Sequence, residues 1–113
     1  MNTYEMRHLY GQAKRYIDLL NNRFRADKLM LQLNKDFYNL NPGGLTLTYY
    51  KVMLAYAKQK VSLTQDSLEN SRASDATRQD NRISSDDTYR LEKKLARELV
   101  SVAYWSNRIG DIQ

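Results

Sequence analysis

The sequence contains no cysteine, a single proline, four glycines and a single histidine. Without cysteine there is no disulfide, no thiolate nucleophile and no thiolate metal site. Residues 1–7 hold no apolar core of the kind that a secretory signal needs. The longest uninterrupted apolar run is Val52–Ala57, whereas a membrane-spanning helix requires about 20 residues. We therefore expect a soluble chain with no membrane span and no export signal, in a compartment that composition does not specify.

Residues that commonly carry catalysis or bind metals are also scarce. His8 is the sole histidine, and the acids of its segment do not cluster around it. A catalytic base or a metal ligand needs such partners. The chain has no nucleophile elbow, no phosphate-binding glycine loop and no metal-ligand spacing. The sequence therefore predicts a non-enzymatic protein with no catalytic residue, metal, cofactor or small-molecule substrate.

The distribution of glycine and proline predicts long helices. Pro42 lies in the motif Asn41-Pro42-Gly43-Gly44, which is a strong helix break. Residues 45–109 contain neither glycine nor proline, although average usage would place roughly eight there. We therefore predict an all-α, lopsided helical hairpin. It has a helical arm over residues 3–40, a turn over 41–46 and a long helical arm over 47–109, within a single domain.

Periodicity adds detail to both arms. Asn2 can cap the first arm, with Glu5 three residues later as in a capping box. The apolar stripe of this arm shifts by two residues after Phe24, near Asn21-Asn22, which predicts a kink or two helices of unequal length. Residues 45–48 alternate in polarity, so they read either as a short strand or as a helix start capped by Thr46 or Thr48.

A sparse apolar stripe follows the whole second arm. Its members lie close to steps of 3.67 residues, the period of an 11-residue repeat, which gives a nearly straight helical coil. The predicted assembly seam consists of Leu54, Val61, Leu68, Ala76, Ile83, Leu91, Leu95, Val102, Trp105 and Ile109. Ser84 or Asp87 can cap the last part of this arm, and Gly110 is a candidate stop.

The middle of the second arm, residues 65–87, is very polar. Its stripe is too thin to stabilise a helix alone, so we hypothesise that it is helical only when assembled. The alternatives are a helix within a monomeric bundle and a mobile acidic linker.

Charge and tyrosine content leave a second function open. Residues 1–60 carry a net charge of +6, residues 61–87 of −3 and residues 88–113 of +2. The basic residues that could contact nucleic acid or line a polar lumen are Arg7, Lys14, Arg15, Arg23, Arg25, Arg72, Arg78 and Arg82. A solvated basic face is the alternative interpretation. The nine tyrosines indicate interfaces, half-buried core positions or stacking on nucleobases.

These patterns predict three classes of function. A helical second arm of this length would span roughly 95 Å, and the first arm is too short to cover it. This mismatch favours a structural protein that self-associates as a homo-oligomer or as a component of a larger particle or tube. The alternatives are a nucleic-acid-contacting accessory or conduit protein, and a small helical inhibitor or adaptor of one protein partner. Nucleic-acid binding would weaken steeply with salt, whereas apolar oligomers would persist.

Overall fold

A computed structural model describes the backbone of residues 1–77 and 82–112 and the side chains of residues 1–72 and 87–112. The described backbone forms four helices: α1 (Thr3–Asp18), α2 (Arg23–Tyr38), α3 (Pro42–Thr77) and α4 (Arg82–Ile112). No strand occurs among the described residues. The prediction of an all-α protein is therefore confirmed.

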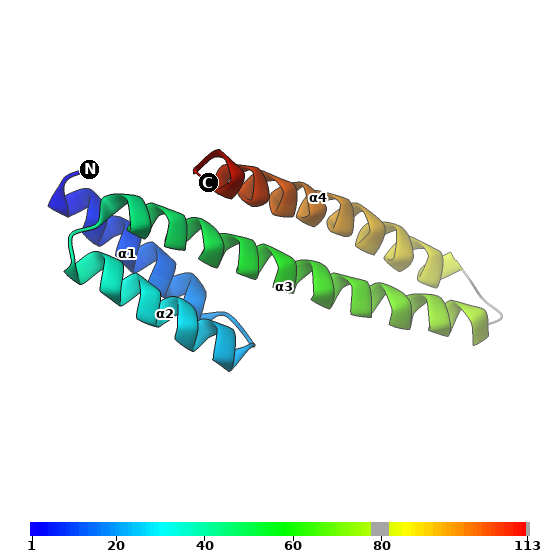
Figure 1. The fold of residues 1–113 in the computed structure, drawn as a ribbon. Coiled ribbons are helices and arrows are strands. Elements are labelled where there is room, and N and C mark those ends of the chain that lie inside the picture. Colours follow the sequence, from blue (N-terminus) through cyan, green and yellow to red (C-terminus); the bar gives the residue numbers. More distant parts are fainter. Residues whose placement is uncertain (78–81, 113) are drawn as a thin grey trace.

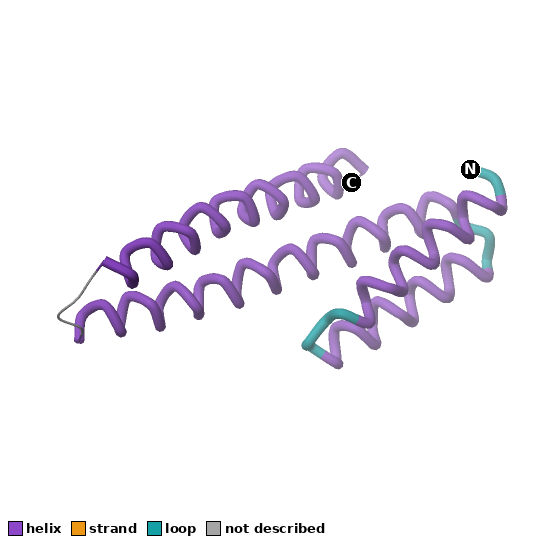
Figure 2. The backbone as a smooth tube through the Cα atoms, turned by 180° about the vertical axis from the view of Figure 1, so that it is seen from behind, coloured by secondary structure: helices purple, strands orange, loops and turns teal. Residues whose placement is uncertain are grey.

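The helices form a short three-helix bundle from which a helical hairpin extends (Figure 1). Helices α1 and α2 are antiparallel and pack on the N-terminal half of α3. Helix α4 runs back along α3 on the side away from α2, as the reversed view also shows (Figure 2). The principal extents are 61 × 26 × 22 Å, and the radius of gyration is 18.1 Å. A compact domain of this length has a radius of gyration of about 13 Å, so the molecule is elongated.

Asparagine side chains cap the first two helices. The Oδ1 atom of Asn2 accepts a hydrogen bond from the backbone N–H of Glu5 at 2.8 Å. Asn22 does the same for Arg25 at 3.1 Å. Each bond satisfies an N–H that has no partner within its own helix. The shift of the apolar stripe near Asn21-Asn22 thus marks a boundary between two helices, and both have 16 residues rather than unequal lengths.

The connection between α2 and α3 is tighter than the predicted turn over 41–46. Leu40 has a φ of 53°, in the left-handed region that glycine usually occupies. The N–H of Asn41 donates to the carbonyl of Asp36, and that of Leu40 donates to the carbonyl of Phe37. This pair of bonds is a Schellman motif, which ends α2 within one turn.

Helix α3 begins at Pro42, earlier than predicted. Proline is favoured at the first helical position because its missing N–H would have no partner there. Asn41, rather than Thr46 or Thr48, is the cap: its Oδ1 accepts from the N–H of Gly44 at 3.1 Å. The segment 45–48 is helical and not a strand.

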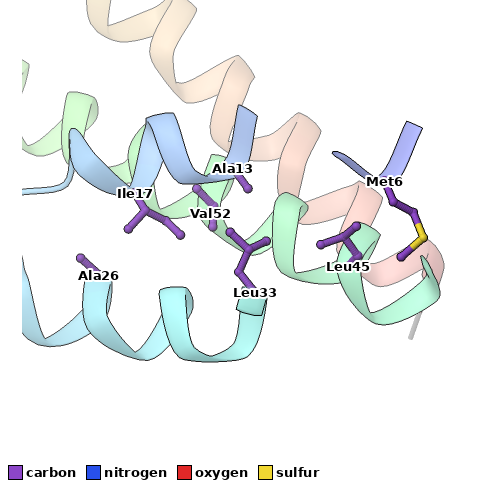
Figure 3. Packing of buried hydrophobic residues seen from close by; sticks show 7 residues of the cluster. All are labelled: Met6, Ala13, Ile17, Ala26, Leu33, Leu45 and Val52. Atoms are coloured by element: carbon purple, nitrogen blue, oxygen red, sulfur yellow. The ribbon is translucent and has the colours of Figure 1, made fainter. Parts of the chain in front are cut away.

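The core lies where α1, α2 and the start of α3 meet (Figure 3). The small side chains of Ala13 and Ala26 are buried between the helices, and Leu33 and Val52 fill the space at the centre of the core. The buried cluster consists of Met6, Ala13, Ile17, Ala26, Leu33, Leu45 and Val52. Gln59 of α3 also holds the α1–α2 connection, donating to the carbonyl of Leu19 and accepting from the N–H of Asn21.

The prediction of one continuous helix over 47–109 is wrong. The chain reverses direction between Thr77 and Arg82, and α4 packs antiparallel on α3 (Figure 1). The four residues between these helices lie outside the described residues. A thin apolar stripe is equally well buried by a helix of the same chain, and folding back supplies that helix without a second molecule. The length mismatch that favoured oligomerisation therefore does not exist.

Two smaller predictions for this arm are also wrong. Ser84 and Asp87 lie inside α4 rather than at its start, and α4 continues through Gly110 to Ile112. The polar middle is divided between the end of α3 and the beginning of α4.

Candidate functional site

The contact between α3 and α4 follows a heptad pattern. On α4 the half-buried residues alternate in steps of three and four: Thr88, Leu91, Leu95, Glu98, Val102, Trp105 and Ile109. On α3 the same spacing places Ala57, Val61, Thr64, Leu68 and Ser71 in buried or half-buried positions. This spacing averages 3.5 residues, so the 11-residue period inferred from the sequence does not describe the packing.

The predicted seam residues are therefore used mostly within one chain. Val61 and Leu68 of α3 and the five α4 residues from Leu91 to Ile109 occupy these positions. Leu54 instead lies in the groove between α2 and α3, beside Leu29. The side chains of Ala76 and Ile83 lie outside the described residues. A surface for self-association has to be sought elsewhere on the molecule.

Polar pairs fix the register of α3 against α4. The hydroxyl of Thr64 donates to a carboxylate oxygen of Glu98, and the hydroxyls of Ser71 and Thr88 are 2.9 Å apart. At the rim, Arg72 forms an ion pair with Glu92 at 3.1 Å. A polar residue at a heptad position is satisfied in one register only, so such pairs select that register.

A cluster of aromatic rings joins the C-terminal end of α4 to α1 and α3. The rings of Tyr16 and Tyr56 lie 5.0 Å apart, and Trp105 lies 5.9 Å from Tyr49 and 5.8 Å from Tyr50. Burial raises the pKa of Tyr49, and the nearby Tyr16 and Tyr50 add to this effect. These rings are separated by up to 89 positions in the sequence, so spacing alone did not reveal the cluster.

A cleft of about 520 Å³ opens beside this cluster, between α1, α3 and α4. We call it the basic aromatic cleft; its lining residues include Tyr16, Tyr56, Lys60, Lys94, Arg97, Glu98 and Trp105. The three cations are exposed, and within the described part of the chain none of them forms an ion pair. Lys60 lies over the Tyr56 ring at 4.8 Å from its centroid. The lining thus combines aromatic faces with an excess of positive charge.

The structure does not gather the basic residues that the sequence suggested for nucleic acid. Arg7, Lys14 and Arg15 are exposed on α1, and Arg72 is paired with Glu92. Arg23 lies in a groove with Asp18 and Asp27, and Arg25 lies in another with Lys51 and Lys58. The side chains of Arg78 and Arg82 lie outside the described residues. Sequence reasoning missed Lys60, Lys94 and Arg97, which only the packing of α4 on α3 brings to one cleft.

The outer face of α2 is a second exposed surface, which no helix among the described residues covers. Phe24, Leu31 and Tyr38 are 70%, 72% and 74% exposed. They follow one another at steps of seven, so they form one stripe along the helix, opposite the buried Ala26 and Leu33. We call this row the α2 stripe. The three side chains lie about 10 Å apart along the helix, and a repeated row of large exposed apolar side chains is a candidate interaction surface.

Charged side chains flank the α2 stripe. Asp27 and Lys28 follow Phe24 by three and four residues, and Lys35 follows Leu31 by four. The Lys28 ammonium lies over the Phe24 ring, 4.7 Å from its centroid. The stripe is therefore an apolar row, one residue per heptad, bordered by both signs of charge.

In the described part of the chain, no three His, Cys, Asp or Glu side chains gather into a possible metal site. His8 is exposed on α1. Among the same residues, no helix is both long and apolar enough to cross a membrane. In comparisons with known proteins, no family model, no curated protein and no solved structure matches the chain.

Proposed function

We propose that the protein has a structural, self-associating role and that two copies pair through the α2 stripe. The observation that carries this proposal is the row of Phe24, Leu31 and Tyr38, each at least 70% exposed and repeated every seven residues. A heptad row on a straight helix is suited to packing against another helix.

An antiparallel arrangement of two copies fits the apolar row. If Leu31 lies at the two-fold axis, each residue lies level with the one at the same distance on the other side of residue 31. Phe24 then meets Tyr38 of the second copy, so the same surface supplies both apolar partners, as an isologous interface requires. At the edge of the row, Lys28 of one copy lies beside Lys35 of the other, because each follows a stripe residue by four positions and so lies on the same side of the stripe.

The expected interface is small. Two aromatic residues and one leucine bury on the order of 500 Å² per copy, compared with about 800 Å² per partner in a standard interface. We therefore expect dimerisation that depends on protein concentration and persists at high salt, because apolar burial dominates it. A single isologous contact closes at the dimer. A larger particle or tube would need a second surface.

The test measures mass by light scattering over a range of protein concentrations. Leu31→Glu places two carboxylates at the two-fold axis and should abolish the dimer, since an unpaired buried charge is costly. Leu63→Glu is the matched control, because Leu63 is exposed on α3 and away from the stripe. Wild-type protein that stays monomeric at all concentrations, or equal loss from both variants, would contradict the proposal.

A charge reversal tests the antiparallel register. Lys35→Glu should strengthen the dimer, because it replaces the Lys28–Lys35 like-charge pairs between the two copies with opposite pairs, and the gain should shrink at high salt. Adding Lys28→Glu places two carboxylates together and should remove the gain. A gain that persists in the double variant would mean that the two copies do not pair about Leu31.

A further inference from the structure

We infer that the basic aromatic cleft binds a nucleotide, with the base against its aromatic faces and the phosphate at its cations. This site goes beyond self-association. Among the described residues, its lining comes from α1, α3 and α4 and includes none from α2. The two proposals can therefore fail independently.

The size of the cleft suits such a ligand. Its volume of about 520 Å³ lies within the roughly 300–1,000 Å³ range of small-molecule sites. It lies between helices that pack on one another, with Tyr16 from α1, Tyr56 from α3 and Trp105 from α4. Helix faces, rather than loops, thus hold the rings in place.

The aromatic side chains supply the surface for a base. Trp105 is half-buried and packed edge-on against Tyr49 and Tyr104, at interplanar angles of 89° and 82°. The ring centroids of Tyr16 and Tyr56 lie 5.0 Å apart, so each ring packs against the other. Rings fixed in this way offer a flat ligand a stacking surface at little cost in conformational entropy, and every nucleobase has a π face.

The cations supply the contact for a phosphate. Lys60 extends from α3, and Lys94 and Arg97 extend from α4, so positive charge lies on both sides of the cleft. Among the described residues, Glu98 is the one carboxylate of the lining, and it accepts a hydrogen bond from Thr64. Three cations against one carboxylate leave a net positive lining. Arginine and lysine form charge-assisted hydrogen bonds to phosphate oxygens, which neutral ligands cannot match.

The single tryptophan provides the readout, because Trp105 lies in the cleft itself. Trp105 fluorescence is titrated with adenosine 5′-monophosphate, with a short single-stranded DNA, with inorganic phosphate and with polyglutamate. We expect saturable quenching by the first two probes that weakens as salt is raised. If adenosine 5′-monophosphate and the DNA both quench, a free nucleotide is sufficient as the ligand. If only the DNA quenches, the cleft binds a nucleotide that is part of a strand.

Two paired variants locate the binding. Lys94→Gln with Arg97→Gln removes both α4 cations of the cleft and should weaken binding roughly tenfold or more, as expected for lost charge-assisted contacts. Arg90→Gln with Lys93→Gln makes the same charge change on the same helix outside the lining and should change binding less than about twofold. All four side chains are exposed, so unchanged melting temperatures are expected and are checked by circular dichroism.

The inference is overturned by any of four results. The first is that neither nucleotide probe quenches Trp105 fluorescence in a saturable way, and the second is that both paired variants weaken nucleotide binding equally. The third is that inorganic phosphate binds as tightly as the nucleotide, and the fourth is that polyglutamate binds as tightly as the DNA. The third result would remove the role of the aromatic faces. The fourth would identify the cleft as a site for acidic peptides. If any of these four results is found and the protein still dimerises, the nucleotide site is refuted while the proposal of pairing through the α2 stripe stands.

Discussion

At the start of α3, one buried carboxylate determines which residue can occupy position 44. Asp36 is 4% exposed and accepts hydrogen bonds from Gln32 at 3.0 Å and from Thr48 at 2.9 Å. It lies against the first turn of α3, where the positive end of the helix dipole favours a negative charge. A Cβ atom at Gly44 would lie 2.7 Å from its Oδ1 atom. Glycine is needed here for space, because no glycine among the described residues has a positive φ.

The adjacent glycines provide a matched prediction. Gly44→Ala forces Asp36 and Asn41 to move and should lower the free energy of unfolding by about 1–3 kcal/mol. A Cβ atom at Gly43 would have only Asn41 nearby, at 3.9 Å. Gly43→Ala should therefore raise the free energy of unfolding, by up to ~1 kcal/mol, since alanine favours helix. Chemical denaturation of both variants measures the difference. Equal effects would mean that Asp36 does not pack on α3 as described.

Helix α3 is unusual among the elements because it is covered on more than one side. Its N-terminal half packs on α1 and α2, while α4 runs along it on another side. The buried residues of α3 therefore do not lie on one stripe; Val52 faces the three-helix core, whereas Leu68 lies beyond it. This arrangement explains why a single period could not describe its apolar positions.

The hydrogen bond between Thr64 and Glu98 provides a prediction for the α3–α4 pair. Thr64→Val removes the donor and leaves the half-buried Glu98 without it, which should cost about 1 kcal/mol in thermal or chemical unfolding. Adding Glu98→Leu replaces both polar partners with apolar ones and should recover this loss. Ser62→Val, at an exposed position nearby, is the control and should change stability by less than ~0.5 kcal/mol. No cost from Thr64→Val would exclude a stabilising role for the pair.

The whole molecule depends on α4 folding back along α3 within one chain. In a continuous helix, residues 71 and 88 would be roughly 25 Å apart. In the hairpin their hydroxyl groups are 2.9 Å apart. The same helices could also exchange between two chains, which would preserve every contact while joining two molecules.

A crosslink distinguishes these possibilities, because the chain has no cysteine of its own. Ser71→Cys combined with Thr88→Cys should oxidise to a disulfide within one chain, seen at monomer mass on a non-reducing gel. Ser71→Cys combined with Ser101→Cys is the control and should not crosslink within the chain. Dimer-sized product in dilute protein would indicate exchanged helices, and no product would indicate that the hairpin does not form.

The sequence by itself determined the all-α class and the approximate boundaries of the first two helices. The cap at Asn2, the boundary near Asn21-Asn22 and the break before Pro42 are local features, set by backbone geometry and by the hydrogen bonds of a few neighbouring residues. The left-handed Leu40 was not foreseen, because a leucine rarely adopts this conformation and nothing in its local sequence marks it.

Only the tertiary structure decided how the second arm buries its stripe. Leu68, Leu91, Leu95 and Val102 are equally apolar whether they face a helix of the same chain or one of another molecule, so their spacing could not separate a hairpin from an assembly. Folding back also created the basic aromatic cleft and left the α2 stripe uncovered. Burial is non-directional and depends on which surfaces meet, and that information is absent from local sequence.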